Sequence, residues 1–229
     1  MPGPMLTADH IARVHQVVAD AGPAPGVEQQ TDADYAEWVG RMLRDHPLGP
    51  IRLFAYGSLI WRPEIAHRAE QPAVARGWHR SFCLRMHRFR GTVDQPGLMM
   101  ALDRGGQCRG VVLELPDEDP GEQLDRIFRR EFTVKPINSM PRWLRVETPD
   151  GPQVALGFVM NRASPYYAGR LAAEEVARVL ARACGHWGTG AEYLLNTVSQ
   201  LEARGIRDAG LWRLQALVAA EIERIAPCA

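Results

Sequence analysis

Long hydrophobic runs are missing from this chain of 229 residues, as is any excess of charge of one sign. Apolar stretches such as 154–160 are far shorter than the roughly 18 residues that a membrane-spanning helix needs. The 27 basic and 27 acidic residues cancel, so nucleic acid and anionic membranes are not expected as partners. The first residues also lack the basic segment of a secretory signal. We therefore expect a cytoplasmic protein.

Cysteine is scarce and scattered. The four cysteines, at positions 83, 108, 184 and 228, form no C-x-x-C pair, so neither a disulfide framework nor a thiolate metal site is expected. The seven histidines form no H-x-x-x-H or H-E-x-x-H pattern, so a metal site has little support. The sequence also contains no phosphate loop, dinucleotide fingerprint or G-x-S-x-G nucleophile motif.

What is present is an ordinary globular composition, with 46% hydrophobic and 24% charged residues. Residues 1–48 are predicted to be a helical extension that precedes a domain over 49–229. Apolar residues at 11, 14, 17 and 18 indicate a first helix, which ends at Gly22-Pro23. Thr31 or Asp32 is the expected cap of a second helix with an apolar stripe from 35 to 43. We expect these stripes to pack on this chain rather than on a partner.

The rest of the chain predicts short strands followed by helices. One hairpin is expected around Gly105-Gly106 and a second around Asp150-Gly151. A helix over 119–130 lies between the hairpins, and the region from 172 onward is helical. The other expected strands are 51–56, 74–76 and 78–86. This order predicts an α+β fold in which a small mixed or antiparallel, barrel-like sheet is flanked by helices.

The segment 53–61 is the first candidate for a functional site. A buried strand there runs into Gly57-Ser58, where the chain can turn sharply and present successive backbone N–H groups. Such a turn can bind a carboxylate or a developing oxyanion. The alternative is a plain turn between a strand and a loop.

The second candidate is Glu131, at or just beyond the end of the predicted helix. The negative end of the helix dipole and burial between Phe128 and Phe132 would raise the pKa of this carboxyl and make it a better base near neutral pH. Arg129 and Arg130 would oppose that shift if either contacts the carboxyl. The alternative is an ion pair on the protein surface.

Six motifs in one order give the chain a family resemblance. The motifs are Tyr56-Gly57-Ser58-Leu59-Ile60-Trp61, Arg90-Gly91-Thr92 with Pro96-Gly97-Leu98, Gly105-Gly106-x-Cys108-x-Gly110, Arg130-Glu131, Tyr167-Ala168-Gly169 and Glu192-Tyr193-Leu194. With these motifs, the chain resembles the ChaC-type, glutathione-specific γ-glutamylcyclotransferases over about residues 51–225.

The resemblance implies a reaction and a set of residues. Members of this family cleave glutathione into 5-oxoproline and cysteinylglycine without a metal or cofactor. Carried over, Glu131 is the proton acceptor, and the loop that holds the γ-glutamyl group consists of Ala55, Tyr56, Gly57, Ser58, Leu59 and Ile60. Tyr56 and Tyr167 are expected to supply hydroxyl hydrogen bonds to the substrate and Arg90 to face a substrate carboxylate. The alternatives are a tyrosine that packs in the barrel and an arginine that ties two loops together.

Three departures from the family pattern leave the base and the loop in place. Ala55 stands where the family usually has glycine, Val93-Asp94 replaces Pro-Glu, and Phe132 follows Glu131. The change at Val93-Asp94 keeps open a cyclotransferase for another γ-glutamyl amine or peptide. A protein that binds γ-glutamyl compounds without catalysis is the other alternative.

Overall fold

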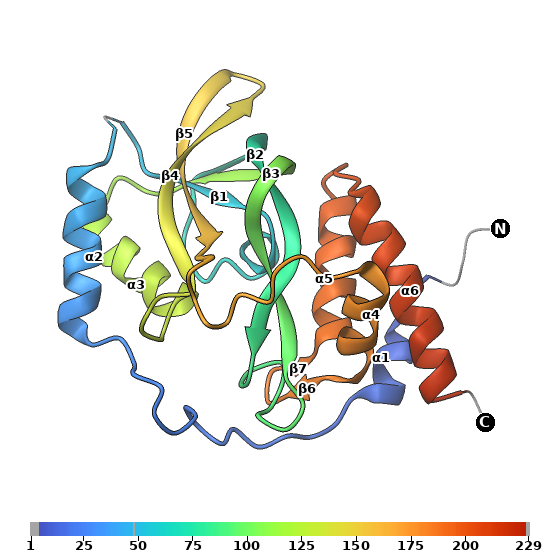
Figure 1. Ribbon diagram of the computed structural model, residues 1–229. Coiled ribbons are helices and arrows are strands. Elements are labelled where there is room, and N and C mark those ends of the chain that lie inside the picture. The colour runs from blue at the N-terminus through green and yellow to red at the C-terminus, as the bar shows by residue number, and fades with distance from the viewer. Residues whose placement is uncertain (1–4, 48, 228–229) are drawn as a thin grey trace. The chain divides into compact units, whose positions relative to one another are not determined.

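The computed structural model describes residues 5–47 and 49–227. Five strands close into a barrel in the order β1-β3-β2-β4-β5 (Figure 1). Strand β5 pairs in parallel with β1 and β3, whereas β1–β3, β2–β4 and β4–β5 are antiparallel. The predicted α+β fold with a small mixed barrel is therefore confirmed. The strands are β1 (Arg52–Ala55), β2 (Ala69–Met86), β3 (Gly97–Glu114), β4 (Ser139–Thr148) and β5 (Gly151–Met160).

The chain forms two compact units. The barrel unit, Val27–Ser81 and Ala101–Tyr167, contains α2 (Asp32–Arg44) and α3 (Pro120–Glu131). The helical unit consists of Met1–Gly26, Phe82–Met100 and Ala168–Ala229. Its helices are α1 (Ala8–Val14), α4 (Ala173–Arg182), α5 (Gly190–Glu202) and α6 (Ala209–Ile225), and it also contains a two-stranded sheet of β6 (Cys184–Gly185) and β7 (Gly188–Thr189). Strands β2 and β3 contribute to both units.

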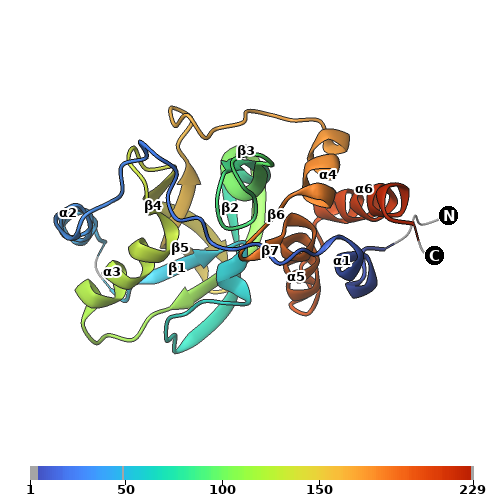
Figure 2. The same ribbon diagram turned by 90° about the horizontal axis from the view of Figure 1, so that it is seen from below.

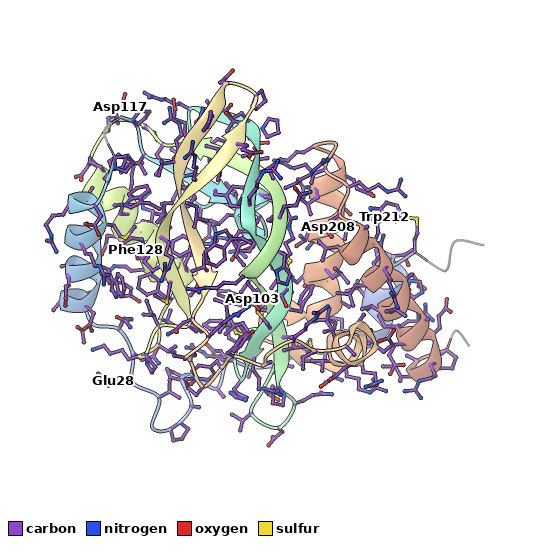
Figure 3. The ribbon with its side chains drawn as sticks, turned by 45° about the horizontal axis from the view of Figure 1, so that its top comes forward. Glu28, Asp103, Asp117, Phe128, Asp208 and Trp212 are labelled. Carbon is purple, nitrogen blue, oxygen red and sulfur yellow. The ribbon has the colours of Figure 1, made fainter. Side chains whose placement is uncertain are left out.

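Aromatic side chains build the core of the barrel unit around α3. Phe128, labelled in Figure 3, is fully buried, and its ring centroid lies 5.3 Å from that of Phe132 and 6.1 Å from that of Phe158. The second predicted helix, α2, packs beside α3 (Figure 2). Its Tyr35 hydroxyl donates a hydrogen bond of 3.0 Å to the Phe132 carbonyl. The expectation that this helix packs on its own chain is confirmed.

The first predicted helix is shorter than its apolar pattern suggests. It ends at Val14, and His15 is already extended, with φ −69° and ψ 136°. Val17 is 99% exposed, so it buries nothing that would sustain another helical turn. In the helical unit, α1 is held by Arg13, which donates to the Ala226 carbonyl at 3.0 Å. The predicted continuation of this helix to residue 18 is therefore wrong.

The hairpin predicted at Gly105-Gly106 is also wrong, because β3 continues through both glycines. Their φ angles, +111° and +65°, bend the strand without reversing it, as expected of glycines at an irregularity within a sheet. The His79 ring lies against this bend, with its Nδ1 3.1 Å from the Gly105 carbonyl oxygen. The strands predicted at 74–76 and 78–86 are likewise parts of one long strand, β2.

The remaining predicted elements are confirmed, except that the region from 172 onward, predicted to be helical, also contains the short strands β6 and β7. The second hairpin pairs Thr148 with Gly151 and continues along the whole of β4 and β5. Asp119, Thr189 and Asp208 cap α3, α5 and α6 by accepting from the backbone N–H three residues ahead. Asp119 thereby fixes the start of α3, the helix that ends at Glu131.

Candidate active site

The candidate substrate loop begins where β1 ends. Ala55 is fully buried, and the chain then makes a 3-10 turn over Ser58–Ile60. The turn is closed by hydrogen bonds from Ile60 N–H to the Gly57 carbonyl at 2.9 Å and from Arg62 N–H to the Ser58 carbonyl at 2.7 Å. The first N–H groups of such a turn have no acceptor within it, so those of Ser58 and Leu59 stand at its start as donors. The six predicted loop residues, 55–60, therefore run without interruption from the last residue of β1 into this turn.

Tyr56 fixes the base of this loop. Its side chain is buried, and its hydroxyl donates to the Phe158 carbonyl of β5 at 3.0 Å. Its own carbonyl accepts from Arg80 Nε of β2 at 2.7 Å. The loop is thus attached to two strands of the barrel at the residue that precedes Gly57.

Glu131 is the last residue of α3, and its side chain is only 18% exposed. Its Oε1 lies 3.2 Å from Arg130 Nε. Burial raises the pKa of Glu131, the positive charge of Arg130 opposes this rise, and the negative charge of Glu64 adds to it; the net pKa lies above the usual value. A carboxyl in this state is a better proton acceptor near neutral pH than an exposed glutamate.

Arg130 connects this carboxyl to the loop. Besides its contact with Glu131, its Nη2 donates to Ser58 Oγ at 3.3 Å, and its Nη1 donates to the Arg62 carbonyl. The structure therefore brings together the two features that the sequence singled out separately. Arg129 points elsewhere, to Asp125 at 2.6 Å and to a carboxylate of α2.

Tyr167 contacts the carboxylate of Asp103, a residue that the sequence analysis did not identify. Its hydroxyl donates to Asp103 Oδ2 at 3.0 Å, and Arg162 Nε donates to Asp103 Oδ1 at 2.6 Å. Asp103, labelled in Figure 3, is 4% exposed on β3. Burial raises its pKa, but the hydrogen bonds from Arg162, the Arg104 N–H and Tyr167 outweigh burial and lower the net pKa. The available signal was one acid in an otherwise apolar strand segment, 98–103.

Arg90 belongs to the helical unit. It is 8% exposed, and its Nη1 donates to the Thr189 carbonyl at 2.8 Å and to Glu192 Oε2 at 2.9 Å. It therefore ties the β2–β3 connection to the start of α5. The Glu192 carboxylate thus pairs with Arg90, while its backbone N–H donates to the Thr189 side chain that caps α5.

Three further observations concern residues 5–47 and 49–227. No helix there is long and apolar enough to cross a membrane. No group of three or more His, Cys, Asp or Glu side chains is arranged in this part of the chain to hold a metal ion. Cys83, Cys108 and Cys184 are buried and form no disulfide there, and Cys228 lies outside the described residues.

Comparisons with known proteins match most of the chain. The family model described as ChaC-like protein matches residues 51–221. The glutathione-specific gamma-glutamylcyclotransferase of Escherichia coli (strain K12) is 37% identical over 164 residues, which cover 71% of this chain and 70% of that protein. The mouse (Mus musculus) glutathione-specific gamma-glutamylcyclotransferase 1 is 30% identical over 160 residues, covering 67% and 70% of the two chains.

Among solved structures, the fold is similar to that of the yeast gamma-glutamyl cyclotransferase specific to glutathione. The TM-score is 0.68 at 19% sequence identity, over 76% of this chain and 97% of the yeast chain. This likeness supports the same barrel fold for both proteins.

Proposed function

Because this chain belongs to the ChaC-like protein family, we propose that it is a glutathione-specific γ-glutamylcyclotransferase. It cleaves glutathione into 5-oxoproline and cysteinylglycine. The observation that carries the proposal is the largely buried Glu131 carboxyl, which one guanidinium joins to the turn at Ser58. The expected cytoplasmic location remains a prediction.

The chemistry is an intramolecular acyl transfer. The α-amine of the γ-glutamyl group attacks the carbonyl carbon of its own side-chain amide, which closes a five-membered lactam. The tetrahedral intermediate then expels the amine of cysteinylglycine, and that amine takes up the proton that the attacking amine gave up. Since nucleophile and carbonyl belong to one molecule, the protein's main task is to hold the folded-back conformer, and orientation alone can lower the barrier by several kcal/mol.

Glu131 moves the proton in this scheme. It accepts a proton from the attacking α-amine and returns it to the departing amine. A raised pKa suits both steps, because the carboxyl must take the proton easily and must also give it back.

The turn that starts at Gly57 stabilises the oxyanion. The N–H groups of Ser58 and Leu59, at the start of the 3-10 turn, are the proposed donors to the oxygen of the tetrahedral intermediate. Tyr56 acts indirectly, since its hydroxyl proton is already given to Phe158. It fixes the base of the turn, and Ala55 and Ile60 complete the loop.

Tyr167 and Arg90 remain predicted substrate-binding residues with defined protein contacts. The Tyr167 hydroxyl gives its proton to Asp103, so the lone pairs on its oxygen are what it offers to a substrate N–H. Arg90 Nη1 donates hydrogen bonds to the Thr189 carbonyl and to Glu192. These contacts also fit the alternative in which Arg90 ties two loops together.

The direct test of Glu131 is the substitution Glu131→Gln, which keeps the shape of the side chain and removes its basicity. We expect the rate of 5-oxoproline release from glutathione to fall by about 100-fold or more, as is typical when a general base is lost. The matched control is Glu122→Gln on the same helix, where the side chain is 65% exposed and pairs with the exposed Arg126. That variant should keep the full rate.

Unchanged turnover in the folded Glu131→Gln protein would remove this residue from the mechanism. Calorimetry that finds tight glutathione binding by the unmodified protein, with no product formed, would instead favour the alternative of a binding protein without catalysis.

A further inference from the structure

Arg130 contacts both parts of the candidate site, the Glu131 carboxyl and the turn at Ser58. Its side chain is 15% exposed, and its three guanidinium nitrogens go to three different groups: Nε to Glu131, Nη1 to the Arg62 carbonyl and Nη2 to Ser58 Oγ. Ser58 and Arg62 are the two ends of one hydrogen-bonded turn. One planar cation therefore spans the loop and holds the end of α3 against it.

We propose that Arg130 is a positioning residue of the reaction. Its charge keeps Glu131 able to accept a proton, and its planar guanidinium group holds the turn at Ser58 in place. This inference rests on the proposed function, since it assigns Arg130 a part in the same site. Within that site Arg130 has two roles, one electrostatic and one geometric, and different substitutions can test them separately.

The electrostatic role follows from the charges that face Glu131. Burial and the carboxylate of Glu64 both favour the protonated form of Glu131, and Arg130 is the cation that opposes them. A glutamate that is already protonated at working pH cannot take a proton from the substrate amine. Arg130 also lies 3.8 Å from Glu64, so it balances both carboxylates.

The geometric role depends on the shape of the guanidinium. Arginine presents several N–H groups in a rigid plane, whereas the ammonium of lysine is a single point on a flexible stem. Lysine at position 130 would keep the positive charge near Glu131 but would not reach Glu131, Ser58 and the Arg62 carbonyl together. The two roles can therefore be separated by substitution.

The experiment compares Arg130→Gln, Arg130→Lys and Glu64→Gln with the unmodified protein. The control is Arg126→Gln, on the same helix, where the side chain is 61% exposed. Two measurements are made on each protein: a carbon-13 NMR titration of the Glu131 carboxyl, and the pH profiles of kcat and KM for glutathione. The NMR titration needs no turnover, and a thermal unfolding curve shows that each variant is folded.

Loss of the cation should raise the pKa of Glu131 by about 1 unit or more, and the acid limb of kcat should move to higher pH by the same amount. Glu64→Gln should move both in the opposite direction. Arg130→Lys should leave the titration close to that of the unmodified protein while KM rises severalfold. Arg126→Gln should change neither measurement.

The same Glu131 titration in Arg130→Gln as in the unmodified protein would overturn the electrostatic role. An unchanged KM in Arg130→Lys would overturn the geometric role. Failure of the proposed function looks different, because the unmodified protein would then release no 5-oxoproline whatever the titrations show. If Arg130→Gln does not fold, Arg130→Met, which also removes the charge, takes its place in the titration, and the KM of Arg130→Lys still decides the geometric role.

Discussion

Asp103 shows how one side chain can organise its neighbours. It is the one acidic residue among the buried polar side chains of the described chain, and it accepts hydrogen bonds from Tyr167, Arg162 and the Arg104 N–H. Because these bonds lower its pKa below the usual value, Asp103 stabilises the fold above the pKa it has when unfolded. That contribution is lost as the pH falls through the lower pKa of the folded state.

The substitution Asp103→Asn keeps the size of this side chain and removes its charge. We expect the free energy of unfolding in urea to fall by about 2 kcal/mol, the usual scale for losing hydrogen bonds to a charged group. If Tyr167 binds substrate as predicted, the KM for glutathione should also rise, because the amide keeps one oxygen where Arg162 and Tyr167 each used their own, and its NH2 group cannot accept from the Tyr167 hydroxyl. A lower stability with an unchanged KM would give Tyr167 a structural role only.

Single residues also mark the limit of what the sequence can predict about the site. The position of Glu131 at the end of a helix was predictable from the cap at Asp119 and the apolar stripe of α3. Which of Arg129 and Arg130 contacts Glu131 was not predictable, because both lie within two residues of Glu131 in the sequence. Arg129 has one local partner, Asp125 four residues earlier at 2.6 Å, and one distant partner, Asp32 of α2 at 2.7 Å. The distant partner lies 97 residues away and has no local signal.

At the level of elements, the connection between β2 and β3 is built on two glycines in contact. A Cβ atom on Gly91 would lie 2.3 Å from the Gly97 nitrogen and 2.7 Å from the Met86 carbonyl oxygen. These neighbours are backbone atoms, so they cannot turn away as a side chain can. The motifs Arg90-Gly91-Thr92 and Pro96-Gly97-Leu98 thus have a packing requirement within the helical unit.

The substitution Gly91→Ala should therefore destabilise the protein by about 1–3 kcal/mol, the range for forcing an extra carbon into a packed site. Its matched control is Gly40→Ala within α2, where a Cβ would meet only the end of the Arg44 side chain, at 3.4 Å. That change should stabilise the protein by about 0.5–1 kcal/mol, because alanine is the better helix former. Both effects are read from the melting temperature, and a Gly91→Ala protein as stable as the unmodified one would contradict the packing argument.

Elements with a local signal were predictable. The caps at Thr31 and Asp119 each begin a helix where the sequence predicts one. The Gly105-Gly106 pair misled because a turn and a bend within a strand use the same positive φ angles. Only pairing with neighbouring strands distinguishes the two, and pairing is not a local property.

At the scale of the whole molecule, the order of the strands could not be predicted from local sequence patterns. The parallel pair of Leu53 with Leu156 joins segments about a hundred residues apart, and nothing in either strand encodes the other. The barrel-like sheet was expected from short strands and from the family resemblance together. The two helices before residue 48 belong to different units, α1 to the helical unit and α2 to the barrel unit. The proposed domain boundary at 48 and 49 remains a prediction.

The measurement that tests the account most directly is the fate of glutathione in water enriched in oxygen-18. An intramolecular attack uses no water, so the unmodified protein should release unlabelled 5-oxoproline and an equal amount of cysteinylglycine, as seen by mass spectrometry. Hydrolysis of the same bond would give glutamate that carries the label. Labelled glutamate, or no product at all, would contradict the proposed cyclotransferase.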